Sequence, residues 1–201
     1  MKIIDQIGGL LVKPEETVTA LLHGAGSMVG SLSVVLLFST ALWVSLALSI
    51  KRLVEAALQL TSISTPGIVN LAGSSVIGAF VFIGLAHDLI NYFLGGVVAH
   101  FVARLLDGAG ELNQVIMVNG YTWVSLVFML IGCIVMAVNF IAGVLITLGL
   151  LVVTWIWHVY LFTIGIAESH GISTGKALLA AVSWDILKLL LGVGLVSAFL
   201  R

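Results

Sequence analysis

The sequence predicts an all-α integral membrane protein, a five-transmembrane-helix bundle with short N-terminal interfacial helices. Hydrophobic residues make up 61% of the 201 residues and charged residues 8%, whereas a soluble domain carries about 25% charged residues. With so few charges and a mean hydropathy of +1.25, lipid has to cover most of the surface. The apolar runs are continuous and far longer than the ~10 residues of a membrane β-strand, which favours helices over a barrel.

Residues 1–26 predict an N-terminal interfacial segment, and residues 27–201 predict a single five-span membrane domain. Apolar residues recur at helical spacing near the start, as expected of an amphipathic helix lying in the interface; they are Ile3, Ile4, Ile7, Leu10 and Leu11. Pro14 suits the first turn of a second short helix, and Glu15 and Glu16 suit its positive end.

The five predicted spans cover residues 28–50, 71–106, 115–138, 141–166 and 173–199. Lys51 and Arg52 end the first span, and Thr65-Pro66-Gly67 separates it from the second. The second span is longer than a bilayer is thick, so we expect it to tilt, kink or project, with Leu94-Gly95-Gly96 as its weakest point.

The third and fourth spans come from one long apolar stretch. It runs from Val124 to Ala167, 44 residues, about twice the ~20 residues that one crossing needs. The chain must therefore turn back, and the polar residue in mid-run is Asn139. This predicts a tight turn at 138–140, and Asn119-Gly120 predicts a bend earlier in the third span.

Five crossings place the two termini on opposite sides of the membrane. The N-terminal side then carries four basic residues and the other side three, namely Lys2, Lys13, Arg104 and Lys176 against Lys51, Arg52 and Arg201. Because basic loops stay in the cytoplasm, this bias favours a cytoplasmic N-terminus.

The second span carries the sharpest polar cluster. Gly84, Asp88, Asn91 and Gly95 are spaced by four, three and four residues, so they share one helix face, and His87 adjoins Asp88. A carboxylate among lipid tails costs roughly 2.5–3.5 kcal/mol, so this face should turn inward, and its glycines would let a neighbouring backbone come close. Two interpretations stay open: a proton or cation site, or an interhelical hydrogen-bond clamp.

The last span carries a second polar group. Asp185 and Lys188 are three residues apart, so they can pair along one helix. Alternatively, Lys188 reaches Asp88 across helices. Together these side chains form the candidate intramembrane polar site: His87, Asp88, Asn91, Asp185 and Lys188.

Several kinds of chemistry find no support in the sequence. With a net charge of −1 and no basic stripe, we expect no nucleic-acid partner. His158, Glu168 and His170 lack the spacing of a metal set, so we expect no metal and no cofactor. The segment 171–176 resembles a phosphate loop, but His170 and Ala177 stand where that motif needs Gly and Ser or Thr. No nucleophile–base constellation is present, so we expect no enzyme.

An aromatic cluster and the one cysteine have structural interpretations. His158 lies among Trp155, Trp157 and Tyr160, a pattern typical of an interfacial aromatic belt. Cys133 lies in an apolar run, which predicts a buried small hydrophobe.

Three segments resemble motifs of the Yip-domain family, the Ypt/Rab-interacting multispan membrane proteins. The segment 108–112 followed by Tyr121-Thr122 is similar to that family's glycine turn, aliphatic stretch and Tyr-Ser or Tyr-Thr pair. The stretch from Trp157 through 168–173 resembles the exit of its fourth span, and 14–17 its opening. The matching positions are Pro14, Gly108, Gly110, Tyr121, Trp157, Glu168 and Gly171. The chain departs from the pattern at 123–125, where the family usually has a proline.

The resemblance implies a non-catalytic protein that organises or shapes membranes in trafficking, or a membrane scaffold for protein partners. About two dozen residues precede the first span, so the chain looks like the compact prokaryotic members, in the cytoplasmic membrane. A Rab-type GTPase partner follows only by analogy with the family. The lipid bilayer is the expected partner, and small-residue faces permit a homo-oligomer. The alternative function is a small ion, proton or solute transporter or channel that uses the polar face of the second span.

Overall fold

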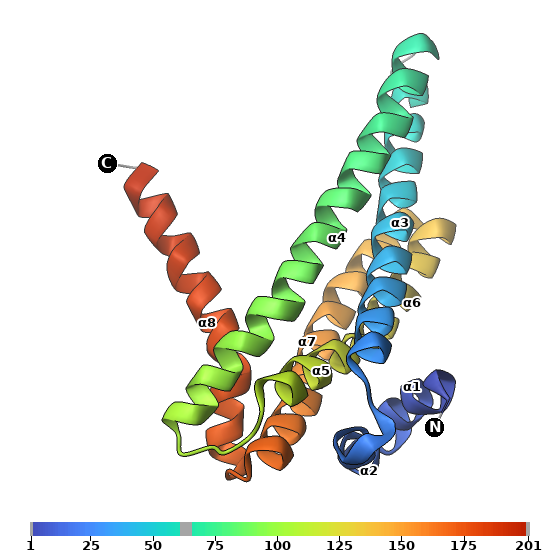
Figure 1. The fold of residues 1–201 in the computed structure, drawn as a ribbon. Coiled ribbons are helices and arrows are strands. Elements are labelled where there is room, and N and C mark those ends of the chain that lie inside the picture. The colour runs from blue at the N-terminus through green and yellow to red at the C-terminus, as the bar shows by residue number, and fades with distance from the viewer. Residues whose placement is uncertain (1, 61–65, 200–201) are drawn as a thin grey trace.

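The computed structural model describes residues 2–60 and 66–199, and all regular structure in these two ranges is helical (Figure 1). The fold class predicted from composition is therefore confirmed. In chain order the elements are α1 (Ile3–Val12), α2 (Pro14–Ala20), η1 (Leu21–Ala25), α3 (Met28–Leu60), α4 (Pro66–Leu105), α5 (Leu112–Thr122), η2 (Trp123–Ser125), α6 (Leu126–Val138), α7 (Phe140–His170) and α8 (Thr174–Phe199).

Four stretches of helix in the described part of the chain are long and apolar enough to cross a membrane: Met28–Glu55, Ile77–Leu105, Leu112–Val138 and Phe140–His170. They correspond to the first four predicted spans. The fifth predicted span corresponds to α8, whose described part carries Lys176, Asp185 and Lys188. These charges interrupt its apolar length, so the fifth crossing stays a prediction.

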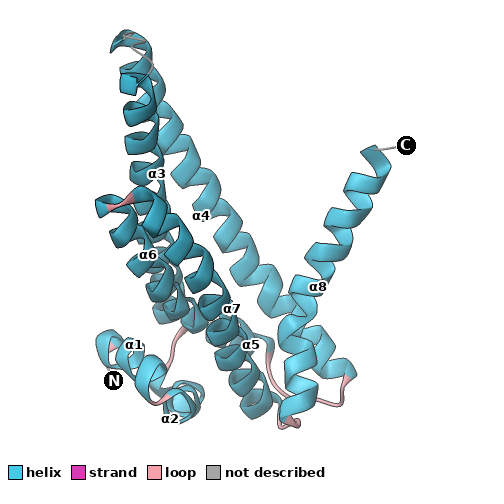
Figure 2. Ribbon diagram, turned by 180° about the vertical axis from the view of Figure 1, so that it is seen from behind, coloured by secondary structure: helices cyan, strands magenta, loops and turns pink. Residues whose placement is uncertain are grey.

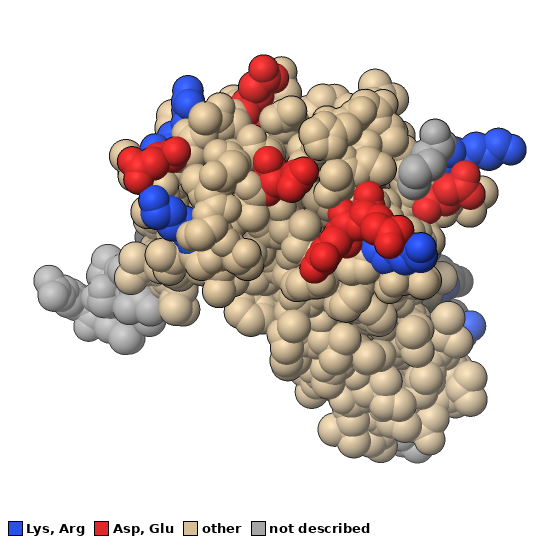
Figure 3. All heavy atoms as spheres, turned by 90° about the horizontal axis from the view of Figure 1, so that it is seen from below, with Lys and Arg blue, Asp and Glu red and all other residues tan. Residues whose placement is uncertain are grey.

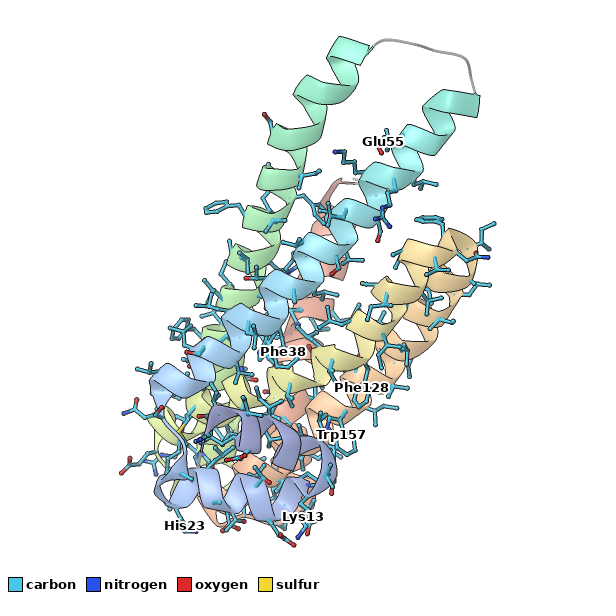
Figure 4. All side chains as sticks on the ribbon, turned by 90° about the vertical axis from the view of Figure 1, so that its right-hand side faces the viewer. Lys13, His23, Phe38, Glu55, Phe128 and Trp157 are labelled. Carbon is cyan, nitrogen blue, oxygen red and sulfur yellow. The ribbon has the colours of Figure 1, made fainter. Side chains whose placement is uncertain are left out.

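Helices α3 and α4 run side by side and project beyond the turn between α6 and α7 (Figures 1 and 4). The expected weak point at 94–96 was wrong, because α4 runs unbroken through it. Gly95 and Gly96 are buried: Gly95 lies against Asn119 and Trp184, and Gly96 against the backbone of Ile116. Packing on both glycines holds this part of the helix in place. Of the expected break at 65–67, Thr65 lies outside the described residues and Pro66 begins α4.

The turn between α6 and α7 is where the sequence predicts it. Asn139 leaves helical geometry (φ −141°, ψ 109°), and its side-chain oxygen accepts a hydrogen bond of 3.1 Å from the backbone N–H of Ala142. It is therefore the N-cap of α7. The two helices then pack closely, because Gly143 lies directly against the backbone of Met136.

The predicted bend at Asn119-Gly120 was wrong, because the helix changes its geometry only after these residues. Helix α5 continues through Asn119 and Gly120, and the chain tightens into a 3₁₀ turn at Trp123–Ser125. Two hydrogen bonds hold Asn119 in the helix. Its backbone carbonyl accepts from Thr122 Oγ1 at 2.6 Å, and its side-chain N–H group donates to the carbonyl of Tyr92 at 2.8 Å.

Helices α1 and α2 lie across one end of the bundle (Figures 1 and 4). Leu10 of α1 and Val18 of α2 enter a buried cluster with Tyr121 and Leu161. Gln6 is also buried, where its side chain accepts a hydrogen bond of 3.1 Å from the hydroxyl of Tyr121. The predicted interfacial helices are thus anchored to the spans by both apolar and polar contacts.

Helix α8 contacts α4 and α7 near the end where α1 and α2 lie, and then diverges from α4 (Figures 1 and 2). The end viewed from below in Figure 3 carries both acidic and basic side chains. The bundle is therefore broad and charged at one end and splayed at the other.

Candidate functional site

Asp88, on α4, is the starting point of a polar network inside the bundle. Its side chain is buried, with the residue 5% exposed. The indole N–H of Trp43, on α3, donates to its Oδ2 atom at 2.6 Å. Gly84 lies one turn earlier, and the Trp43 ring packs directly on its Cα. The face predicted to turn inward does so, and its glycine makes room for an indole ring rather than for a neighbouring backbone.

His87 and Asn91 extend the network along α4. The Nδ1 atom of His87 lies 3.1 Å from Asp88 Oδ1, and Asn91 Nδ2 donates to the carbonyl of His87 at 2.8 Å. The His87 side chain is 64% exposed. Asp88 is therefore a buried hydrogen-bond clamp between α3 and α4. His87, which contacts Asp88, is exposed at the molecular surface.

Asn91 joins this network to α8. Its Oδ1 atom accepts from Trp184 Nε1 at 2.7 Å and from Lys188 Nζ at 3.2 Å. Lys188 also pairs with Asp185 at 2.7 Å, as its sequence spacing predicts. The sequence allowed Lys188 to pair with Asp185 on the same helix or with Asp88 across helices. Of these two carboxylates, the described contacts of Lys188 include Asp185 alone. Trp155 Nε1, on α7, donates to Asp185 at 3.0 Å and ties a third helix to the group.

His158 belongs to the same region, and its interpretation as part of an aromatic belt was wrong. Thr122 Oγ1 donates its one proton to the carbonyl of Asn119, because a carbonyl can only accept. His158 Nδ1, 3.0 Å from that hydroxyl, must therefore donate to it. In a neutral imidazole this leaves Nε2 as an acceptor. A signal was present in the sequence: Thr154, His158 and Phe162 recur every four residues, so they share one face of α7.

These side chains surround a cavity of about 230 Å³ between α4, α5, α7 and α8, with η2 and α6 at its edge. Four of the five predicted site residues line the cavity: His87, Asn91, Asp185 and Lys188. Asp88, the fifth, is not part of the lining. Further polar and aromatic side chains of the lining, which were not predicted as site residues, are Asn119, Trp123, Thr154, Trp155, His158 and Trp184. Asn91 and Lys188 each lie 14 residues from the charged end of their helix, roughly 21 Å at the 1.5 Å rise of an α-helix. A bilayer core is about 30 Å thick, so the predicted crossing by α8 would place the cavity deep in the membrane.

The glycine turn of the family motif meets the exit of α7 at the charged end. The backbone N–H of Gly110 donates to His170 Nδ1 at 3.0 Å, and that of Ala109 donates to the carbonyl of His170 at 3.1 Å. Gly108 lies directly against the His170 ring. Gly171 then ends α7 with φ +65°, a conformation that glycine adopts without strain. His170 lies inside the resembling stretch 168–173, although it is not one of the single matching positions, and it holds these two segments together.

The other motif positions serve packing or capping. Pro14 begins α2, as predicted, and Tyr121 fixes Gln6 of α1. Trp157 packs edge-on against Phe128. Glu168 lies 3.4 Å from the ring of His23, which brings the end of α7 beside the N-terminal segment.

Among the described residues, no three His, Cys, Asp or Glu side chains lie close enough to hold a metal ion. The rings of two histidines, His100 and His170, lie close together, with centroids 5.1 Å apart. His170 Nδ1 already accepts from Gly110, so in the neutral ring Nε2 carries the proton. The Nε2 atom of His170 therefore has no lone pair to offer a metal.

Of three comparisons with known proteins, one found a match and two found none. No curated protein and no solved structure matches the chain significantly. The model of the Yip1 domain family matches residues 8–196, nearly the whole chain, and therefore includes the interfacial helix α2, the glycine turn and the exit of α7. With its apolar helices and this match over almost its full length, the chain belongs to the Yip1 domain family and is an integral membrane protein.

Proposed function

We propose that this Yip1-domain protein is a non-catalytic membrane protein that shapes or organises the bilayer and serves as a scaffold for other membrane proteins. The observation that supports it best is the uneven cross-section of the bundle. Helices α1 and α2 add to its width at one end only (Figure 1). A protein that occupies more area in one leaflet than in the other favours a curved bilayer.

Helix α1 has the surface that such a role needs. Gln6 and Leu10 face the bundle, whereas Ile4 is 75% exposed and Val12 79% exposed. The two exposed residues are eight positions apart and so lie toward the same, outer side of the helix, which also carries the exposed Asp5. An apolar face of this kind, held at the interface by the protein, enters the headgroup and acyl boundary of one leaflet.

Reconstitution into liposomes tests this proposal. The full chain is compared with the double variant Ile4→Glu/Val12→Glu, which makes the outer face of α1 polar and leaves Gln6 and Leu10 in place. Lys2→Glu changes the net charge by the same amount without altering the apolar face, and serves as the control. We expect wild type and Lys2→Glu to give smaller or tubular vesicles as protein density rises, and the double variant to lose this effect. Vesicle diameters that never depend on protein density would overturn the proposal.

The remaining parts of the proposal rest on family resemblance. A location in a prokaryotic cytoplasmic membrane, with the N-terminus in the cytoplasm, agrees with the four-to-three bias in basic residues. Self-association is allowed by the small residues on the helices. Binding of a Rab-type GTPase is an analogy alone; a pull-down with purified GTPase in both nucleotide states tests it, and the absence of nucleotide-dependent binding would remove it.

The cavity supports a second candidate function, transport of a small ion, proton or solute. The polar side chains around it lie deep in the membrane, where ionisable groups mark pathways in transporters. Flux across proteoliposomes is measured for wild type, for Asp88→Asn, and for the variant Asp185→Asn/Lys188→Met, which removes both cavity charges together. Equal leak in all three would exclude this function.

A further inference from the structure

Lining residues on α7 and α8 reach the surface, so the cavity is open beside these two helices. Trp155 and Leu151 at its edge are 49% and 48% exposed, and the Lys188 side chain across from them is 42% exposed. Lys188 lies roughly 21 Å along α8 from its start at Thr174, a depth at which acyl chains surround the protein. With α8 crossing the bilayer as predicted, the mouth of the cavity faces lipid rather than water.

Hydrogen-bond donors in the cavity remain unused. The ammonium of Lys188 has three protons; its described hydrogen-bond partners are Asp185 and Asn91, so one proton has no hydrogen-bond acceptor among the described residues. Thr154 is 6% exposed and its hydroxyl has no partner among the described residues. The hydroxyls of Thr147 and Thr163 on the same helix each bond the carbonyl four residues earlier. Thr154 is therefore the exception on α7, and it lines the cavity.

Trp123 provides another unused donor. Its indole N–H is buried and has no partner within the described part of the chain. His158 Nε2, assigned above as an acceptor, lines the same space. A buried polar group without a partner costs about 1–3 kcal/mol, so a molecule that supplied the missing partners would be favoured here.

The charge of the cavity indicates which kind of molecule could supply the missing hydrogen-bond partners. Asp185 lies 2.7 Å from Lys188, so the two opposite charges in the lining are paired with each other. A phosphate headgroup would bring a negative charge deep into the membrane without a free cation to meet it, at a high cost. With donors in excess of acceptors, the site favours an uncharged head that carries hydroxyl and carbonyl oxygens. The volume of about 230 Å³ is below the ~300–1,000 Å³ of pockets that enclose a whole ligand, so only the head enters.

We propose that the cavity binds the head of an uncharged glycerolipid of the diacylglycerol class, taken laterally from the bilayer. The glycerol hydroxyl and ester oxygens accept from Lys188, Thr154 and Trp123, and the hydroxyl proton goes to His158 Nε2. The acyl chains leave between α7 and α8 into the membrane. This inference concerns a ligand site and stands independently of the bilayer-shaping role proposed above.

Tryptophan fluorescence gives a direct test, because Trp123, Trp155 and Trp184, three of the five tryptophans, line the cavity. Wild-type protein in phosphatidylcholine vesicles is titrated with diacylglycerol brominated in its acyl chain near the glycerol. Bromine quenches tryptophan on contact. Brominated phosphatidylcholine and brominated phosphatidylglycerol at equal mole fraction report contact with the surrounding lipid and with an anionic head. We expect saturable quenching by diacylglycerol and non-saturable quenching by the other two.

Substitutions tie the quenching to the cavity. Thr154→Val removes the unused hydroxyl at nearly constant volume and should weaken the saturable phase about five-fold, the effect of one hydrogen bond. Thr147→Val makes the same change at a hydroxyl that bonds its own helix, away from the cavity, and should leave the phase unchanged. Ala181→Leu fills the cavity and should abolish it. Circular dichroism and gel filtration show whether each variant folds.

Three results would overturn the proposal. The first is diacylglycerol quenching that stays linear and equals that of phosphatidylcholine. The second is phosphatidylglycerol quenching that saturates as tightly as diacylglycerol quenching, since the site would then accept an anionic head. The third is equal binding by the Thr154→Val, Thr147→Val and folded Ala181→Leu variants.

Discussion

The indole N–H of Trp43 donates a hydrogen bond of 2.6 Å to Oδ2 of Asp88, and so joins α3 to α4 in the interior of the bundle. Neither residue is close to the other in sequence, and Asp88 is buried. The pair explains how an ionisable side chain is kept away from lipid on a helix whose opposite face is exposed, as at Phe82 and Ile83.

This pair predicts a difference between two substitutions at Asp88. Asp88→Leu leaves the indole N–H of the half-buried Trp43 without an acceptor and should lower the free energy of unfolding by about 1–3 kcal/mol. Asp88→Asn keeps an acceptor oxygen and should cost less. Unfolding in mixed detergent micelles measures both, and Trp43→Phe completes a double-mutant cycle. An Asp88→Leu protein as stable as Asp88→Asn would contradict the clamp.

Gly84 should tolerate no side chain. A methyl group at this position would meet the Trp43 ring directly, so Gly84→Ala should lower the free energy of unfolding by about 1–3 kcal/mol through overpacking. Gly78, on the same helix, has nothing within 4 Å of an added Cβ. Gly78→Ala should be neutral or stabilising by up to about 1 kcal/mol, because alanine has the higher helix propensity. The same loss of stability in both variants would show that the indole contact is not the cause.

His170 should control the loop between α4 and α5. Since Gly110 N–H donates to its Nδ1 atom, His170→Leu should increase hydrogen exchange at the Gly110 amide about five- to ten-fold. His170→Asn places an acceptor oxygen near the position of Nδ1 and should restore much of the protection. Mass spectrometry of peptides covering residues 106–112 reports the exchange. If Gly110 is equally protected in both variants, the hydrogen bond does not hold this loop.

Asn139 should contribute to stability as the N-cap of α7. Asn139→Ala removes the acceptor for the Ala142 N–H and should cost about 0.5–2 kcal/mol, whereas Asn139→Asp or Asn139→Ser should recover most of it. Unfolding in detergent measures the series. If Asn139→Ala has the same free energy of unfolding as wild type, the cap does not contribute, and the close packing of α6 on α7 is enough to stabilise the turn.

The sequence predicted those features that depend on local pattern. The excess of apolar residues predicted the fold class, the length of the run around Asn139 predicted the turn, and the spacing of Asp88 and Asn91 predicted a shared inward face. These properties follow from helix periodicity and bilayer thickness, which act on each segment separately.

What could not be predicted is which helices meet. Trp43 and Trp184 carry no sign in the sequence that they hydrogen-bond to Asp88 and Asn91, because interhelical partners depend on packing of segments far apart in the chain. His158 was misassigned for the same reason: its aromatic neighbours in sequence are typical of an interface, whereas its contact with Thr122 comes from α5. The position of the 3₁₀ turn at Trp123–Ser125 likewise has no sign in the local sequence.

The lipid-facing position of the cavity and the placing of the two termini on opposite sides both depend on α8 crossing the bilayer, so the side of the membrane on which each end of the chain lies is the most direct measurement. Single cysteines are placed at Lys2 and at Arg201 in a Cys133→Ser background, and a membrane-impermeant maleimide is applied to sealed vesicles of known orientation. Five crossings predict that the two sites are labelled from opposite sides, with Lys2→Cys labelled from the cytoplasmic side. Labelling of both sites from the same side would contradict the five-span bundle.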